Sequence, residues 1–491
     1  MTRLNRRTLL KAAGLQAGAW AFRRPGLAHS LLAGSNPAKT PIARQLAEFV
    51  RRVRYEDLPA NVIRKAKEQI VYHLGLAFGG IRTQESEQAL AVIRPLALPR
   101  GATVIGERFR LSLSDAAFYN TTVMRGLWRD DVTWPTGIHA GIITLPPGLA
   151  VGELRHSSGR ELLVAYVLGY EVMCKLARVA DPWSTTQPRR PTMVYGAFGP
   201  ITVAGRLMQL DEERLANAYG YAANLTMGVP QGGQTEHFYG LLCRYATCAA
   251  EFAEAGGAPY SPYTIEGATG LYRSFFGVVP PTLAQEIRAL GSDWEILTAA
   301  QKRYPGTGQN TVATEVFRGL LAAEHLRTED VARIDVYTGF ASESIERKRE
   351  LASRGPFKDW VDAWASLPYS LAVVLVYGAM NATRYQANLQ DPRVDAAMSL
   401  VHLHTEAGHA APRYARVEVI TRNGRKVSRD ADNAVFPFPP EAWGPWLQED
   451  GRHFLPLEQL QRIERSIAEL ENVPDVSLLA AQLVPQVRNR G

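Results

Sequence analysis

The sequence contains no run of about twenty consecutive apolar residues, which excludes a helix of bilayer-spanning length. Cysteine is also scarce, since only Cys174, Cys243 and Cys248 occur among 491 residues. An odd and low count argues against a disulfide framework, and we interpret the three thiols as core packing rather than as catalytic groups. The mature protein is therefore expected to be soluble, with no membrane contact once its leader is removed.

Acidic residues are missing from the first part of the chain, where none occurs before Glu48. A pair of arginines, Arg6 and Arg7, precedes a short, mildly apolar run from Ala12 to Phe22. This order is typical of a twin-arginine export signal, which we place at residues 1–33. The prediction implies a periplasmic or extracellular location. The alternative is a disordered basic tail.

The positive charge is concentrated in this leader. The formal net charge is +7, and six basic residues lie within the signal, so the mature chain carries about +1. These six residues are Arg3, Arg6, Arg7, Lys11, Arg23 and Arg24. No basic stripe with interleaved aromatic residues appears elsewhere, which disfavours nucleic acid as a partner.

The spacing of apolar residues divides the remaining chain into a part with helical periodicity and a part that also contains strand-like alternation. From residue 40 to about 297 it is helical: Thr40-Pro41 and Asp211 resemble helix starts. Residues 333–339 and 415–421 alternate like strands, and Asn423-Gly424 predicts a hairpin turn. We therefore predict a mainly α fold: a large all-helical domain (38–297), interrupted by a smaller α+β lid domain (298–434), and completed by a return linker and C-terminal helices (435–491).

One loop carries a candidate catalytic set. A helical segment ends in Asp130 and Asp131, a Pro/Gly loop follows, and His139 stands just before the next apolar helix. Acids and a histidine at the mouths of two helices suit proton-transfer chemistry. The alternatives are a solvated turn, or helix capping by the two acids, and a structural histidine.

Five short motifs occur in order along the chain. They are Asp115-Ala-Ala leading through Asn120 to Asp130-Asp131, Gly159-Arg-Glu-Leu-Leu with Gly169-Tyr-Glu-Val172, Glu266-Gly-Ala-Thr-Gly270, Lys302-Arg-Tyr-Pro305 and Ser366-Leu-Pro-Tyr369. Together they resemble the MmgE/PrpD family over nearly all of the chain after the signal. The resemblance implies an all-helical domain with an α+β lid, a homodimer, no metal and no organic cofactor.

The resemblance also implies a function. It points to a lyase of the dehydratase or decarboxylase type that acts on a small hydroxy- or polycarboxylate by proton abstraction next to a carboxylate. The family's catalytic positions fall at His139, Lys302, Tyr369, Asp130 and Asp131. Tyr369 has the alternative of an ordinary core tyrosine, and Lys302 that of a surface loop charge.

Several family positions are altered in this chain. Arg125 and Arg190 stand where the family has histidines, Trp128 where it has an aspartate, Glu236 where it has a lysine and Thr307 where it has histidine or cysteine. We predict that Arg125, Arg190, Glu236, Arg303 and Thr307 bind the substrate. The exchange of histidine for arginine retains the capacity to bind anions but loses proton transfer near neutral pH, and the alternative for Arg125 and Arg190 is a solvent-exposed basic residue. Glu236 has two other interpretations, a replacement acid or base and a partner for Arg125 or Lys302.

Two other functions stay open: an isomerase or epimerase using the same proton abstraction, and a carboxylate-binding protein without catalysis. Weaker sites are disfavoured. His402, His404 and His409 have irregular spacing for a metal. The Gly-rich segment 228–233 lacks the Lys-Ser/Thr of a phosphate-binding loop, and no Ser-containing elbow suggests a hydrolase.

Overall fold

The structure is a computed structural model, and it describes residues 40–134, 136–179, 191–226, 236–258, 261–338, 345–378, 389–406, 414–432 and 438–485. The predicted export signal, Arg190 and His409 lie outside these ranges. None of the helices within them is both long and apolar enough to cross a membrane.

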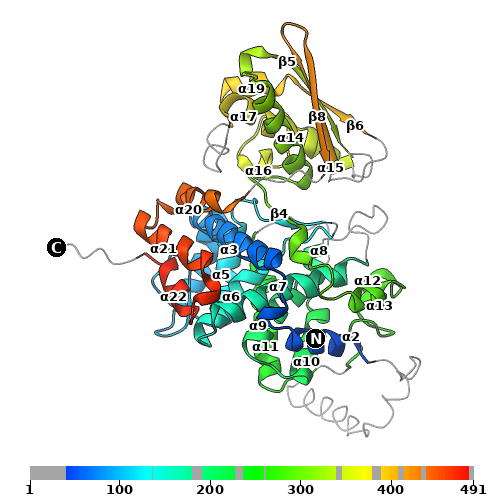
Figure 1. Cartoon of the computed structure of the whole chain (residues 1–491), viewed down its shortest axis with the longest axis vertical. Coiled ribbons are helices and arrows are strands. Elements are labelled where there is room, and N and C mark those ends of the chain that lie inside the picture. Colours follow the sequence, from blue (N-terminus) through cyan, green and yellow to red (C-terminus); the bar gives the residue numbers. More distant parts are fainter. Residues whose placement is uncertain are drawn as a thin grey trace, which may run out of the picture.

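The larger body is built from helices, as the sequence predicted (Figure 1). The described helices of this body, in chain order, are α2 (Ile42–Arg52), α3 (Ala60–Gly80), α4 (Gln84–Ile93), α5 (Leu113–Arg125), α6 (Gly141–Leu154), α7 (Gly159–Ala177), α8 (Pro191–Tyr195), α9 (Phe198–Leu207), α10 (Glu212–Asn224), α11 (Glu236–Glu254), α12 (Leu271–Phe276), α13 (Leu283–Arg288), α20 (Trp443–Gly451), α21 (Leu457–Ala468) and α22 (Ser477–Ala480).

The core of this body joins two distant stretches of sequence. One continuous hydrophobic cluster contains residues from Ile42 to Ala299 and then from Phe438 to Leu483. In Figure 1 the C-terminal helices α20 and α21 lie beside α3, and the two segments are in contact. The chain therefore leaves this core and later returns to it.

Local sequence signals fix where these helices begin. Ser158 accepts a hydrogen bond from the backbone of Glu161 at the start of α7, and Glu161 reciprocates, which forms a capping box. Asp211 caps α10 in the same way through the backbone of Arg214. Gly80 allows α3 to approach α5 closely, because a Cβ there would lie 1.8 Å from the carbonyl oxygen of Val123.

The smaller body contains a four-stranded sheet with the order β6-β5-β7-β8 (Figure 1). Its strands are β5 (Val331–Thr338), β6 (Val401–Thr405), β7 (Tyr414–Thr421) and β8 (Lys426–Asp432). β5 pairs parallel with β6 and antiparallel with β7, and β7 forms the predicted hairpin with β8. Gly424 in the turn has a left-handed φ of 84°.

Among the described residues, this body also contains the helices α14 (Gly308–Glu324), α15 (Ile345–Ala352), α16 (Trp360–Ala363), α17 (Leu367–Tyr377) and α19 (Pro392–Met398). A second hydrophobic cluster, from Tyr304 to Val419, fills the space between helices and sheet. Each body therefore has its own core. The fold class predicted from the sequence, mainly α with a smaller α+β part, is confirmed.

Candidate active site

A two-stranded ladder that the sequence did not predict positions the candidate residues. Strand β3 (Val132–Thr133) pairs antiparallel with β4 (Ala299–Ala300), and Val132 lies opposite Ala300. Continuing this register by two residues brings Asp130 opposite Lys302. The acidic loop of the helical body and the lysine at the joint between the bodies therefore meet, although they are far apart in the sequence.

A buried tyrosine of α3 braces the same place. The hydroxyl of Tyr72 accepts the backbone N–H of Lys302 at 2.9 Å. It also lies within hydrogen-bond distance of the carbonyl oxygens of Lys302 and Arg129. Burial raises the pKa of this phenol far above its ordinary value, so it stays neutral. One side chain thus ties both crossing segments to α3.

His139 faces the two acids through a single ring nitrogen. Its Nδ1 lies 2.8 Å from the carbonyl oxygen of Asp131 and 2.6 Å from the carboxylate of Asp130. Because a carbonyl oxygen only accepts hydrogen bonds, Nδ1 must carry the hydrogen. In the neutral ring, Nε2 is then the nitrogen with a free lone pair. The side chain is 20% exposed, whereas Asp130 is fully buried.

Asp130 is the anion of the cluster. Its carboxylate pairs with the guanidinium of Arg125 and with His139. Burial alone would raise the pKa of Asp130, but the positive charges of Arg125, His139 and Lys302 hold it well below the ordinary value. The carboxylate is therefore ionised near neutral pH. It can stabilise an imidazolium at His139, but it cannot serve as a proton donor.

Asp131 has a different environment from its neighbour. One carboxylate oxygen accepts the N–H of Gly141 at 3.1 Å, at the first residue of α6, and lies 3.1 Å from Nε2 of His73. The other oxygen accepts the hydroxyl of Tyr170 at 2.8 Å. The carboxylate of Asp131 therefore binds the start of α6, as in the helix-capping alternative, while its backbone carbonyl orients His139.

Aromatic rings enclose Arg125. Its guanidinium carbon lies 5.1 Å from the ring centroid of Trp128 and 4.7 Å from that of Tyr239. The ring of Tyr239 also meets the edge of His139, with centroids 5.9 Å apart. Arg125 is 3% exposed, so its charge is held in a low-dielectric environment rather than at the surface.

Two of the residues predicted at the joint, Lys302 and Arg303, are cations. Lys302 is buried, and its ammonium donates to the carbonyl oxygen of Gly306 at 3.2 Å. Arg303 is half-buried, and its Nε lies 4.0 Å from a carboxylate oxygen of Glu315. Burial lowers the pKa of Arg303 from its usual value. Both cations lie at the chain crossing that connects the two bodies.

Thr307 and Tyr369 have structural contacts in the smaller body. Thr307 caps α14, where its hydroxyl donates to the side-chain oxygen of Asn310 at 2.6 Å and accepts the Asn310 N–H. Tyr369 is fully buried in the second hydrophobic cluster, and its ring meets that of Phe357 edge-on at 5.5 Å. These contacts explain both residues without a ligand, and they leave their predicted roles untested.

Two predicted substrate-binding residues are not covered by the described parts of the chain. The side chain of Glu236 is not among those described, and Arg190 lies in an undescribed stretch. His404 sits on β6, 2.6 Å from Asp335 and stacked on Tyr337. Across the described parts of the chain, no group of three His, Cys, Asp or Glu side chains is arranged like a metal site.

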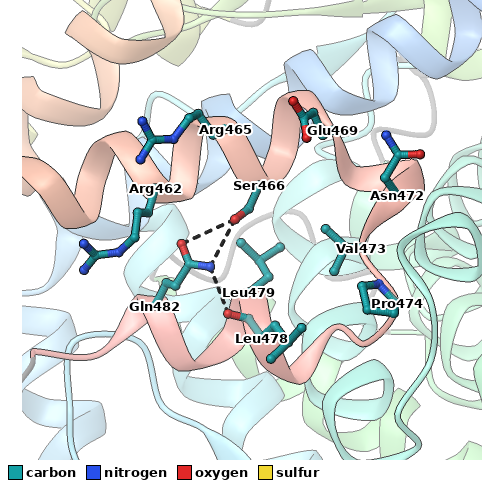
Figure 2. A pocket seen from close by; sticks show the side chains of 10 residues that line it. All are labelled: Arg462, Arg465, Ser466, Glu469, Asn472, Val473, Pro474, Leu478, Leu479 and Gln482. Atoms are coloured by element: carbon teal, nitrogen blue, oxygen red, sulfur yellow. Dashed lines mark hydrogen bonds between the residues drawn. The ribbon is translucent and has the colours of Figure 1, made fainter.

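A surface groove lies elsewhere in the helical body. Its volume is about 420 Å³, and it runs between α21 and α22 (Figure 2). It is lined by Arg462, Arg465, Ser466, Glu469, Asn472, Val473, Pro474, Leu478, Leu479 and Gln482. Gln482 crosses it with hydrogen bonds to Ser466 and to the Leu478 carbonyl oxygen. None of these residues belongs to the His139 cluster.

Sequence reasoning missed the second set of residues around the acids. Tyr72 and His73 lie in the C-terminal half of α3 and Tyr170 lies in α7. Both stretches are buried on nearly all sides, so no polar stripe marks these residues. The one available signal was their chemistry, since a histidine and tyrosines within apolar helices require polar partners when buried.

Comparison with known proteins covers most of the chain. Residues 44–284 match the MmgE/PrpD N-terminal domain, and residues 304–443 match the MmgE/PrpD C-terminal domain. The cis-aconitate decarboxylase of Aspergillus terreus (strain NIH 2624 / FGSC A1156) is 24% identical over 397 residues, covering 75% of this chain and 79% of that protein. The cis-aconitate decarboxylase-like protein oryM of Aspergillus oryzae (strain ATCC 42149 / RIB 40) is 24% identical over 494 residues, covering 90% and 96%.

Proposed function

Because this chain belongs to the MmgE/PrpD family, we propose that it is a lyase that acts on a small polycarboxylate at the His139 cluster. The similarity to cis-aconitate decarboxylases supports a decarboxylase or dehydratase type of reaction, with cis-aconitate as the first compound to test. Because the identity to these relatives is about 24%, the proposal also depends on the chemistry of the His139 cluster.

The observation that carries the proposal is the arrangement around the His139 ring. Asp130 and the Asp131 carbonyl both contact Nδ1, at 2.6 and 2.8 Å. Nε2 is thereby set up as the proton-transfer atom, while an ionised carboxylate stabilises the ring after it gains a proton. A partly exposed histidine with a buried anionic partner suits a general base or acid.

The surrounding cations fit an anionic reaction. Loss of a proton or of carbon dioxide next to a carboxylate leaves negative charge on the substrate. Lys302 and Arg303 lie at the joint, and Arg125 lies behind Asp130. Their burial strengthens the electrostatic attraction for such charge. We propose that Lys302 and Arg303 hold substrate carboxylates and that Arg125 keeps Asp130 ionised.

The test is turnover in deuterated water. The mature protein is incubated with cis-aconitate, citrate and other small polycarboxylates, and NMR records products and deuterium uptake. His139→Ala is expected to lose about 10²- to 10⁴-fold in rate, the usual contribution of a general acid or base. His156→Ala is the matched control, since that histidine is exposed and pairs with Asp475.

The outcomes separate the alternatives. Release of carbon dioxide or formation of an alkene supports the lyase. Deuterium exchange without either product points to an isomerase or epimerase. Tight binding without turnover or exchange overturns the enzyme proposal and favours a binding protein. Full activity of His139→Ala overturns the role assigned to this histidine.

A further inference from the structure

Trp128 lies where the two bodies meet. It follows α5 in a tight turn and has a left-handed φ of 52°, which is unfavourable for a residue with a large side chain. Its carbonyl oxygen accepts the N–H of Gly306 from the joint. The backbone at this position is therefore strained and is tied to the chain crossing near Lys302.

The indole ring is fixed on several sides. Arg125 lies over it, and the rings of Trp364 and Trp360 from the smaller body meet it edge-on, with centroids 4.7 and 6.0 Å away. The residue is 5% exposed. A ring held by these contacts cannot turn freely, so the direction of its N–H is set by packing.

This N–H has no protein acceptor among the residues that the structure describes. Leaving a buried donor unsatisfied is costly, and most buried donors in folded proteins find a partner. Trp128 also contacts Arg125. Arg125 pairs with Asp130, and Asp130 in turn pairs with His139. A fixed donor beside a fixed cation suits an oxygen atom of an anionic ligand.

We infer that Trp128 is a specificity-determining residue whose indole N–H binds a carboxylate oxygen of the substrate. This inference rests on the proposed function, because it assumes a carboxylate ligand at the His139 cluster.

The test uses Trp128→Phe, which removes the N–H and keeps an aromatic ring. Trp360→Phe is the matched control, because it shortens a neighbouring indole by the same atoms. The probes are tricarballylate and two compounds that each lack one of its carboxylates, glutarate and methylsuccinate. Calorimetry measures the three affinities for the wild type and both variants, and circular dichroism checks that each variant is folded.

The expected result is selective. Trp128→Phe binds tricarballylate about 10- to 100-fold more weakly, as for a lost hydrogen bond to a charged group, while Trp360→Phe changes affinity by less than about threefold. The dicarboxylate that lacks the bound group is insensitive to Trp128→Phe. A structural effect of the substitution would instead weaken all three probes alike, and this result would overturn the inference.

The indole resonance gives a second readout. In ¹⁵N-labelled protein, the N–H signal that disappears in Trp128→Phe identifies this residue, and tricarballylate should shift it downfield. An unshifted signal with unchanged affinity of the variant overturns the role of Trp128 and leaves the proposed function standing. Failure of the wild type to bind any of the probes, or cis-aconitate, overturns both.

Discussion

Replacing Asp130 by asparagine should strongly destabilise the helical body. The substitution keeps the shape of the side chain but removes the negative charge that pairs with Arg125 and faces His139. Both Asp130 and Arg125 are almost completely buried. Removing one partner of a buried ion pair leaves a buried charge without compensation, which typically costs about 3–5 kcal/mol.

The pH dependence of this loss follows from the pKa of Asp130. The neighbouring cations hold this pKa well below the ordinary value of 3.8. The pair therefore adds stability above about pH 4, and this contribution is lost as the pH falls through the lower pKa of the folded state. The difference between the wild type and Asp130→Asn should be largest at neutral pH and should narrow in acid.

The assay is urea unfolding followed by circular dichroism at neutral and acid pH. Glu87→Gln is the control, because its ion pair with Arg82 is largely exposed, with side-chain exposures of 47% and 66%, and should contribute less than about 1 kcal/mol. The double variant Arg125→Met/Asp130→Asn removes both charges and should recover most of the stability. If Asp130→Asn shifts the urea midpoint no more than Glu87→Gln does, the buried-pair reasoning is wrong.

Three further predictions concern packing, pH and capping. Gly141→Ala should destabilise by about 1–3 kcal/mol or more, seen as a lower melting temperature, because its Cβ would lie 1.9 Å from the ring of His73. Burial raises the pKa of Glu171 from 4.5 to about 7, so the stability of the wild type should fall as the pH rises through this interval. Glu171→Gln should remove up to about 3 kcal/mol of this fall, measured from the urea midpoints at pH 5 and pH 8. Thr307→Val should cost about 1 kcal/mol by removing the cap shared with Asn310, with no change in KM; a raised KM in a stably folded variant would instead support the predicted substrate contact.

Much of the fold was readable from the sequence because its signals are local. The aspartate cap at Asp211 and the Asn423-Gly424 turn each act within a few residues, and both appear in the structure. Strand β6 was not predicted, since its five residues carry two histidines and pair in parallel with a strand some seventy residues earlier. Parallel pairing of this kind leaves no local pattern.

The candidate site was less predictable because its geometry depends on distant segments. The sequence placed Asp130, Asp131 and His139 in one loop, but it did not distinguish the environments of the two acids. That difference comes from His73 and Tyr170 on helices far away in the chain. The short β3–β4 ladder that brings Lys302 to the loop contains only two residues per strand, too few for a recognisable pattern.

The order of synthesis matters for a core that is assembled from both ends of the chain. Helix α3 is complete at Gly80, but its partners α20 and α21 begin only at Trp443 and Leu457. At roughly 5–20 residues per second, a ribosome needs tens of seconds to make the interval between them. The smaller body, which has its own core, is synthesised during this time, while one apolar face of α3 remains uncovered. Premature termination near residue 440 should therefore destabilise the helical body, which would lack α20 and α21, and should leave the smaller body intact.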